Sequence, residues 1–278
     1  MIAVAGGLGA ALAWAAAALF SARASRAIGV ASTLAWVMLI GLAVALPAVL
    51  LAGGHTPDGG AIGWLAGSGI GNVVGLGLIY AAFRSGKVGV VTPIASTEGA
   101  VAAVIAVALG EHLAPGVGAA LGVVGIGVVL AAAAHGSEGR TSTRVIVLAS
   151  TSALSFGVSL YATGRASNEL AIAWTILPAR LIGTLAVAVP LAAAGRLAVT
   201  RTAAPYVIGA GLAEIGGFAS YAVGARHGIA IAAVLASQFA AVAALGALIL
   251  YRERLTRAQV AGIAVIAVGV AALSALRA

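Results

Sequence analysis

The 278-residue chain has no cysteine, which excludes disulfide bonds, thiolate metal ligands and cysteine nucleophiles. Charged residues are also scarce, at 8% of the chain, where a soluble domain has about 25%. Aromatic residues make up only 5%. What the chain does contain is apolar: 62% of its residues are hydrophobic, and alanine and glycine dominate. Because small side chains let helix backbones approach closely in lipid, we predict an integral membrane protein.

Basic residues outnumber acidic ones, with 15 Lys and Arg against 7 Asp and Glu and a net charge of +8. A protein that binds nucleic acid gathers its cations in a patch or stripe. Here the cations are scattered singly through short loops. This pattern is typical of contact with lipid headgroups, so we expect the lipid bilayer as a partner and no nucleic acid.

The sequence offers little for catalysis or for a bound cofactor. All four histidines, His55, His112, His135 and His227, lie in loops or at span ends. A metal site or a Ser-His dyad in the middle of the membrane therefore lacks its histidine. No phosphate-binding P-loop is present, so ATP hydrolysis by this chain is not expected. We predict no metal, no cofactor and no enzyme activity.

Long apolar runs divide the chain into segments that can cross a membrane. A helix needs about 20 mostly apolar residues to cross roughly 30 Å of hydrocarbon. Cutting the sequence at charged and Gly/Pro-rich stretches gives ten predicted spans, at 2–20, 28–51, 61–83, 88–109, 115–134, 145–163, 171–194, 204–224, 229–250 and 257–276. No stretch between them is long enough to enclose a separate soluble core.

The sequence repeats itself at mid-length. Shifted by 142 residues, GSGIGNVVGLGLIYAAFRSG (67–86) lies over GAGLAEIGGFASYAVGARHG (209–228). We therefore predict two five-helix repeats, residues 1–139 and 140–278. Because five is odd, the second repeat enters the membrane from the opposite side. The predicted fold class is an all-α membrane protein with ten transmembrane helices as two inverted five-helix repeats.

Inverted repeats are typical of secondary transporters, which bind substrate near the membrane midplane and open to each side in turn. The alternative is a duplicated helical bundle with a purely structural role.

Two stretches resemble the paired EamA-type domains of the drug/metabolite transporter superfamily: ASTEGAVAAVIAVALGEHLAPGVGAALGVVGIGVVL (95–130) and ASQFAAVAALGALILYRERLTRAQVAGIAVIAVGVAAL (236–273). In that family each half ends with a helix, a Gly-Glu-Arg-Leu-like turn and a last helix containing Gln-x-x-Gly. The second half matches with Glu253-Arg254-Leu255 and Gln259-Val260-Ala261-Gly262. The first half has Gly110-Glu111-His112-Leu113 and no equivalent Gln. The resemblance implies a ten-helix exporter or exchanger of small metabolites, often amino acids.

Three charged residues fall near the middle of predicted spans: Glu98, Arg180 and Glu214. Inserting one such group costs about 2.5–3.5 kcal/mol even on lenient scales, so three together cost on the order of 8–10 kcal/mol. We therefore expect them to face each other or water, in one polar cavity where the two repeats meet.

These three residues are the main candidates for substrate binding. Arg180 suits a substrate carboxylate or phosphate, because its planar guanidinium pairs with an anion through two hydrogen bonds. Glu98 or Glu214 would then hold an ammonium group, so the site suits a zwitterion such as an amino acid. The alternative is a structural bridge between Arg180 and a glutamate.

With two acids and one base, one carboxylate has no fixed partner. Burial favours the neutral form of a carboxyl group, so such a residue can take up and release a proton during transport. We predict proton coupling through Glu98 or Glu214, with Glu98 as the first candidate. The alternative is a glutamate that stays protonated and serves only the structure.

Other polar residues are assigned to the same substrate site. Asn72 lies over Glu214 at the 142-residue offset, so both halves carry a hydrogen-bonding group at one level of equivalent helices. Gln238 follows Ser237, which coincides with Ser96 at an offset of 141. The alternative for Ser96, Ser237 and Gln238 is ordinary hydrogen bonding between helices.

Two aromatic residues complete the predicted site. Phe218 and Tyr221 lie four and seven residues after Glu214, on one helix face. Their rings can hold an amine by cation–π contact, although simple packing is an equal alternative.

Small residues and prolines indicate how the helices are arranged. Gly67, Gly71 and Gly75 form a stripe, which predicts a seam of close helix packing. Pro93 and Pro178 lie just before the charged residues of the fourth and seventh spans, where a missing backbone donor kinks or opens a helix.

Basic residues concentrate in the loops that follow odd-numbered spans. These loops contain eleven of them: Arg23, Arg26, Arg84, Lys87, Arg140, Arg144, Arg196, Arg201, Arg252, Arg254 and Arg257. The opposite side has three, Arg165, Arg226 and Arg277. The positive-inside rule predicts a multi-pass protein of the cell (inner) membrane with both termini outside the cytoplasm. Eukaryotic members of the superfamily are thought to have cytosolic termini, so the charge pattern and the resemblance disagree.

The sequence thus predicts a secondary active transporter that exports a small-molecule substrate such as an amino acid, by alternating access and with proton coupling. An uncoupled metabolite or lipid-linked-sugar translocator is the first alternative. A non-transporting membrane scaffold is the second, although a scaffold has no use for buried charges. The sequence leaves the substrate, the direction, and the choice between monomer and homodimer open.

Overall fold

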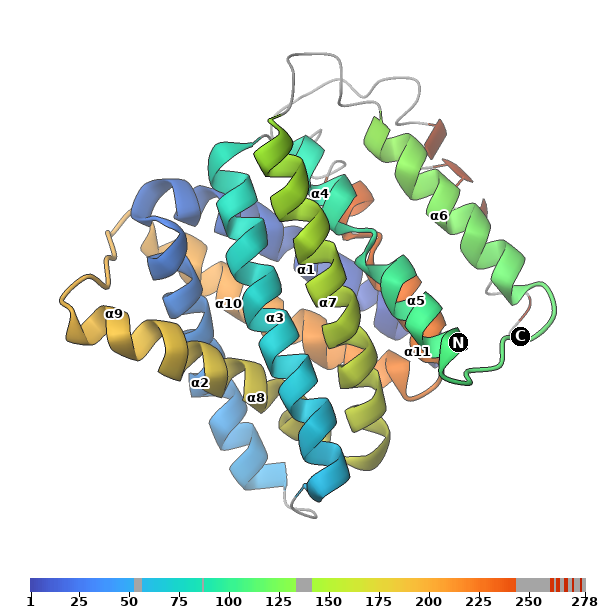
Figure 1. Cartoon of the computed structure of the whole chain (residues 1–278), viewed down its shortest axis with the longest axis horizontal. Helices are drawn as coiled ribbons and strands as arrows, with labels where there is room; N and C mark the ends of the chain where they lie inside the picture. Colours follow the sequence, from blue (N-terminus) through green and yellow to red (C-terminus); the bar gives the residue numbers. More distant parts are fainter. Residues whose placement is uncertain are drawn as a thin grey trace.

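A computed structural model describes residues 1–52, 57–86, 88–133 and 142–243, together with scattered residues between 261 and 276. Every regular element in these ranges is a helix, and the helices form one bundle (Figure 1). They are α1 (Ile2–Ile28), α2 (Val30–Ala52), α3 (Gly59–Ser85), α4 (Val88–Ala95), α5 (Glu98–Ala108), α6 (Val117–Ala133), α7 (Thr143–Glu169), α8 (Ile172–Gly183), the π-helical turn η1 (Thr184–Ala188), α9 (Val189–Ala193), α10 (Ala204–Ala225) and α11 (Ile229–Ala236).

Six of these helical segments are long and apolar enough to cross a membrane: α1, α2, α3, α7, the run from α8 to α9, and α10. Shorter apolar helices supply the fourth, fifth and ninth predicted spans, the ninth only as far as residue 243. The tenth, 257–276, falls mostly outside the described residues, as does the Glu253-Arg254-Leu255 motif. The predicted all-α membrane fold is confirmed.

Large apolar side chains point outward from these helices. Leu12, Leu51 and Leu154 are each more than half exposed. In water such exposure would be unfavourable, whereas in a bilayer these side chains contact lipid tails.

Two predicted helix ends are wrong. The first span was expected to end at residue 20 and the sixth at 163, but α1 continues to Ile28 and α7 to Glu169. The added turns contain Arg23 and Arg165, which were taken as loop residues. Arginine is a good helix former, and at a span end its charge reaches the headgroups without ending the helix.

The fourth and ninth spans are broken at equivalent points. Helix α4 stops at Ala95 and α5 starts at Glu98, while α11 stops at Ala236 and helical structure resumes at Phe239. The breaks therefore coincide at the 141-residue offset that aligns Ser96 with Ser237. Interrupted helices that meet near the membrane midplane are typical of transporter binding sites.

The packing of the helices repeats in the two halves. Among the described elements, the most extensive contacts are those of α1 with α10 and of α3 with α7. These are equivalent pairs, because a shift of one repeat turns α1 into α7 and α3 into α10. Both pairs run antiparallel: Gly6 meets Gly224 and Phe20 meets Tyr206, just as Gly71 meets Ser159.

Two cation–π contacts show this equivalence at single residues. The Arg23 guanidinium lies 5.7 Å from the Tyr206 ring centroid, and the Arg165 guanidinium lies 5.9 Å from that of Trp64. Arg165 and Tyr206 are the 142-residue counterparts of Arg23 and Trp64. In each half, one arginine thus contacts an aromatic ring on a helix of the other half. The two contacts lie at opposite ends of the bundle.

The predicted glycine seam on α3 is confirmed. A methyl group on Gly71 would fall 2.7 Å from the backbone oxygen of Ser155, and one on Gly75 would fall 2.7 Å from the Phe156 ring. Hydroxyl groups reinforce the seam, since Ser159 donates to the Ser68 carbonyl at 2.8 Å and Ser152 donates to the Gly75 carbonyl at 2.9 Å. Backbones this close leave no room for a side chain.

We expect Gly71→Ala to destabilise the protein by about 1–3 kcal/mol, because the new methyl group forces α3 away from α7. Gly63→Ala is the matched control on the same helix, where nothing lies within 4 Å of an added methyl group. Alanine favours a helix interior over glycine by roughly 0.5–1 kcal/mol, so the control is expected to be slightly more stable than the wild type. Thermal unfolding in detergent measures both, and equal effects of the two variants would contradict the seam.

Candidate functional site

A partly open cavity with about 460 Å³ of empty space lies between the two halves of the bundle. Its walls come from α1, α3, α5, α7 and α10, and from Phe239 after the second helix break. Two carboxylates, Glu98 and Glu214, line it. The sequence predicted one cavity for Glu98, Arg180 and Glu214, and two of these three residues line it.

Glu98 is the first residue of α5, directly after the break in the fourth span. Among the described residues, none donates a hydrogen bond to its carboxylate and none forms an ion pair with it. The break itself supplies a compensation, because the first N–H groups of a helix lack acceptors and carry partial positive charge. A carboxylate in the first turn gains about 0.3–1 kcal/mol from this charge, and up to about 2 kcal/mol when partly buried.

Glu214, in the middle of α10, has two fixed partners. Arg180 Nη2 lies 3.6 Å from Glu214 Oε1, and the Asn72 amide donates to the same oxygen at 3.1 Å. All three side chains are buried. Asn72 and Glu214 are equivalent positions of the two repeats, and the structure places them in direct contact.

Arg180 lies behind Glu214 and not in the cavity wall. Its guanidinium is 5.8 Å from the Phe218 ring centroid, and its Nη1 is 3.8 Å from the sulfur of Met38. Gly41 on α2 makes room for it, since any side chain there would overlap Arg180. The π-helical turn η1 follows four residues later, and such turns are frequent at functional sites.

The remaining wall of the cavity is strongly aromatic. The chain has five phenylalanines, and four of them line this one cavity: Phe83, Phe156, Phe218 and Phe239. Trp14 and Tyr80 join them. In a chain with only 5% aromatic residues, this concentration gives the cavity a largely aromatic wall.

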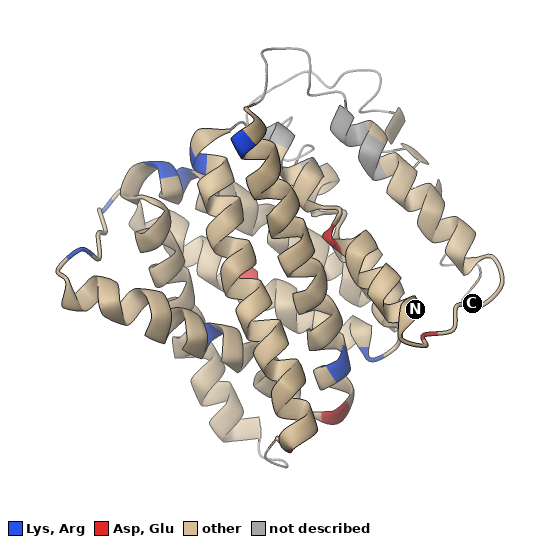
Figure 2. Cartoon of the chain, in the orientation of Figure 1, with Lys and Arg blue, Asp and Glu red and all other residues tan. Residues whose placement is uncertain are grey.

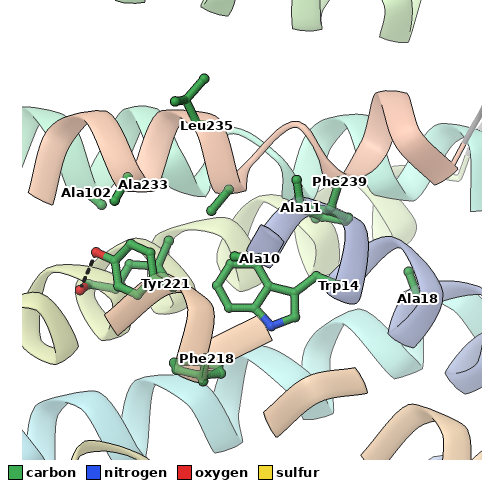
Figure 3. Packing of buried hydrophobic residues seen from close by; sticks show 14 of the residues in the cluster. Ala10, Ala11, Trp14, Ala18, Ala102, Phe218, Tyr221, Ala233, Leu235 and Phe239 are labelled. Atoms are coloured by element: carbon green, nitrogen blue, oxygen red, sulfur yellow. Dashed lines mark hydrogen bonds between the residues drawn. The ribbon is translucent and has the colours of Figure 1, made fainter. Parts of the chain in front are cut away.

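Tyr221 and Gln238, both assigned to the site, lie outside the cavity wall. The Tyr221 hydroxyl donates to the Leu160 carbonyl at 2.8 Å, and its ring lies 6.2 Å from that of Trp14 (Figure 3). Gln238 sits in the second helix break and donates to the Val234 carbonyl at 2.8 Å. Ser237 donates to the same carbonyl. The contacts of Tyr221 are those of ordinary packing between helices. Ser237 and Gln238 instead bond within their own span, so these bonds are not the helix-to-helix bonds of the structural alternative.

Sequence reasoning missed Trp14, Tyr80, Phe83, Phe156 and Phe239 as wall residues. One signal was present: Phe156 is the 142-residue counterpart of Trp14, so both repeats place an aromatic ring at this level. Phe239 is likewise the 141-residue counterpart of Glu98, and both follow a helix break.

The cavity extends toward one face of the membrane. It reaches Ser21 and Phe83, near the C-terminal ends of α1 and α3. Their counterparts on α7 and α10, Thr163 and Ala225, are buried and absent from its wall. Figure 2 shows most basic residues at the edge of the bundle where α1 and α3 end. The cavity therefore extends further toward the basic face than toward the opposite one.

The opposite face is closed by contacts between the halves. Ser68 and Thr163 share a hydrogen bond of 2.6 Å, and Arg226 donates to the carbonyl oxygens of Ser167 and Leu170. Arg226 thus ties the end of α10 to the end of α7. Its counterpart Arg84 is exposed on the basic face, and the structure describes no hydrogen bond or ion pair for it.

Glu111, from the turn that carried the family resemblance, also belongs to the closed face. Both of its carboxylate oxygens accept from the Ala230 N–H, at 3.2 and 3.3 Å. Ala230 lies in the first turn of α11, where an acidic group is favourable. The turn of the first half therefore caps a helix of the second half.

Among the described residues, no group of three His, Asp or Glu side chains could hold a metal ion. The site thus consists of two carboxylates, one buried guanidinium and an aromatic wall, set between helix pairs that are closed at one face and open at the other. This is the arrangement of a membrane transporter for small molecules.

Comparison with known proteins agrees. Residues 1–133 match the model of the EamA-like transporter family. A solved crystal structure has the same fold, with a TM-score of 0.77 at 19% sequence identity, over 99% of this chain and 96% of its own. No curated protein matches the chain. The resemblance to the drug/metabolite transporter superfamily is confirmed by this match, which implies a multi-pass membrane transporter of small molecules.

We expect Arg180→Met to destabilise the protein by about 3–5 kcal/mol, because Glu214 then stays buried without its guanidinium partner. Arg180→Met combined with Glu214→Gln removes both charges and keeps the oxygen that accepts from Asn72, so most of the lost stability should return. Thermal unfolding in detergent measures both variants. A double variant as unstable as the single one would show that the ion pair is not the reason for the burial of these residues.

Proposed function

We propose that the protein is a proton-coupled exporter that moves a small molecule with an amino group across the cell membrane by alternating access. The observation that carries this proposal is the charge balance of the cavity: two carboxylates line it, and Arg180 neutralises one of them. The other, Glu98, is left for a proton or a substrate cation.

Coupling follows from competition at Glu98. The ionisable residues that line the cavity with Glu98 are Glu214 from α10 and Tyr80 from α3, and Glu214 is held by Arg180. No cation of this set faces Glu98 directly. A protonated Glu98 is neutral and loses its hold on an ammonium group, so substrate and proton bind in turn and move in opposite directions.

Export follows if the basic face is cytoplasmic, as the positive-inside rule requires. The cavity of this structure would then load from the cytoplasm, with the N-terminus outside. Amino acids remain candidates, with the ammonium group at Glu98. Their carboxylate would have to reach Arg180 in place of Glu214.

For the second half of the cycle, the proposed repeats 1–139 and 140–278 exchange roles. The closed face would open as the Ser68–Thr163 and Arg226 contacts break. The basic face would close as Arg84, the counterpart of Arg226, reaches the end of α1. Each of these contacts has an equivalent in the other repeat. In the proposed cycle, the two states therefore differ in which of the two equivalent contacts is formed.

Glu98→Gln is expected to abolish the acceleration of transport by a pH gradient, because an amide of the same shape cannot exchange a proton. Glu169→Gln, at the exposed end of α7, is the matched control and should behave as wild type. The measurement is substrate flux in proteoliposomes with and without an imposed pH gradient. Full pH dependence in Glu98→Gln would indicate an uncoupled translocator.

Because the chain has no cysteine, single cysteines can report which face each side of the cavity opens to. We expect Ser21→Cys to react with an impermeant maleimide from the basic face. Thr163→Cys, its 142-residue counterpart, should be protected at rest and should react from the opposite face during turnover. Labelling is compared in right-side-out and inside-out vesicles. Reaction of both from one face would contradict alternating access between the repeats.

A further inference from the structure

We infer that the transported substrate is a lipophilic organic cation: an amine attached to an aromatic or bulky apolar group, with no carboxylate. This inference rests on the proposed function and narrows its substrate class. It departs from the amino acid that the sequence alone favours.

The first argument is the sign of the charges that a ligand meets. Among the described residues, the cavity wall contains Glu98 and Glu214 and no Lys, Arg or His. An anionic group inside it would face two carboxylates at close range in a medium of low dielectric constant, where repulsion is strong. A cation is attracted to both carboxylates, and Glu98 has no competing partner among the described residues.

The second argument is that Arg180 is already occupied. It is completely buried behind Glu214, with Phe218 and Met38 against its other sides. A substrate carboxylate could reach it only by displacing Glu214, which would leave that acid buried and unpaired. Removing one partner of a buried ion pair is strongly destabilising, so the pair acts as structure rather than as an anion site.

The third argument is the character of the wall. Six aromatic side chains surround the cavity, and Trp14 and Phe218 pack edge to face at 5.2 Å between ring centroids. Aromatic faces attract cations and pack against apolar groups. Apart from the two acids, the wall offers only Ser21, Tyr80 and the indole N–H of Trp14 for hydrogen bonds. Such a wall does not replace the water around a sugar or a second charged group.

One hydrogen-bond donor in the cavity wall has no partner in the protein. The indole N–H of Trp14 is buried without a hydrogen-bond partner. A ligand acceptor, such as an ether or hydroxyl oxygen, would satisfy it.

The test compares substrates that differ only in charge. The full chain is reconstituted in proteoliposomes, and uptake is measured for tryptophan, tryptamine and N,N,N-trimethyltryptammonium, which is permanently charged and does not leak through the bilayer. We expect uptake of both cations at least about tenfold above that of tryptophan, with inhibition of tryptamine uptake by the trimethyl compound. Tryptophan transport equal to or above that of the cations overturns the inference and leaves the proposed transporter standing. No uptake of any compound, with or without a pH gradient, overturns both.

A second measurement assigns the binding to this cavity. Phe156→Leu and Phe218→Leu should raise the KM for the trimethyl compound by roughly 2- to 30-fold, because each removes one aromatic face. Phe20→Leu is the matched control, since Phe20 is the one phenylalanine outside the wall and packs against Tyr206. The trimethyl compound should also raise the Tm of the wild type but not that of Glu98→Gln. Equal effects of all three phenylalanine variants would overturn the inference.

Discussion

The arrangement depends on one electrostatic constraint: a carboxylate buried in lipid must be neutralised, and this protein has two carboxylates for one guanidinium. Arg180 and Asn72 satisfy Glu214, which joins α3, α8 and α10 in the interior. Glu98 is left to the helix terminus that the break in the fourth span creates. The same break that interrupts the hydrogen bonds of the span thus supplies part of the charge that makes an unpaired acid tolerable there. The proposed preference of the cavity for a cation rests on this imbalance.

The duplication accounts for both the symmetry of the scaffold and the asymmetry of the site. Arg23 with Tyr206, and Arg165 with Trp64, are two copies of one contact, placed at opposite ends of the bundle. In contrast, the acid at Glu98 corresponds to Phe239 in the second copy. The repeats therefore share the residues that hold helices together and differ in the residues that touch the cavity, which is expected if packing constrains both copies and chemistry constrains one.

Much of this was readable from the sequence. Ten apolar runs and a 142-residue repeat predict the fold class, because few folds suit a chain with so few polar side chains. Glu98 and Glu214 were placed in one cavity because an acid in an apolar run has few environments open to it. The aromatic wall was not foreseen, because Phe83 or Phe156 within a run of Ala and Val is indistinguishable from ordinary packing. Its recognition needs the rotation of each helix about its axis, and helices that are apolar all round carry no periodic signal for that rotation.

The break in the fourth span was foreseen in part, because Pro93 predicted an opened helix just before Glu98. The break in the ninth span and the exact partner of Arg180 were beyond the sequence. Ser96-Thr97 and Ser237-Gln238 are not strong helix terminators, so tertiary contacts decide that the chain bends there. Arg180 could be assigned to an anion, but its partner depends on the register of α8 against α10. The site assignments that concern substrate and proton remain proposals that rest on this geometry.

One packing detail has a mechanical meaning. Glu111 fastens the turn after α5 to the first turn of α11, and Gly99 at the start of α5 lies directly against Ala233 and Ser237 of the other broken span. Helices α5 and α11 are thus held together by the Glu111 hydrogen bond at one end and by backbone contact near their breaks. These contacts couple the two helices, so a displacement of Glu98 at the start of α5 would also shift the backbone beside Phe239.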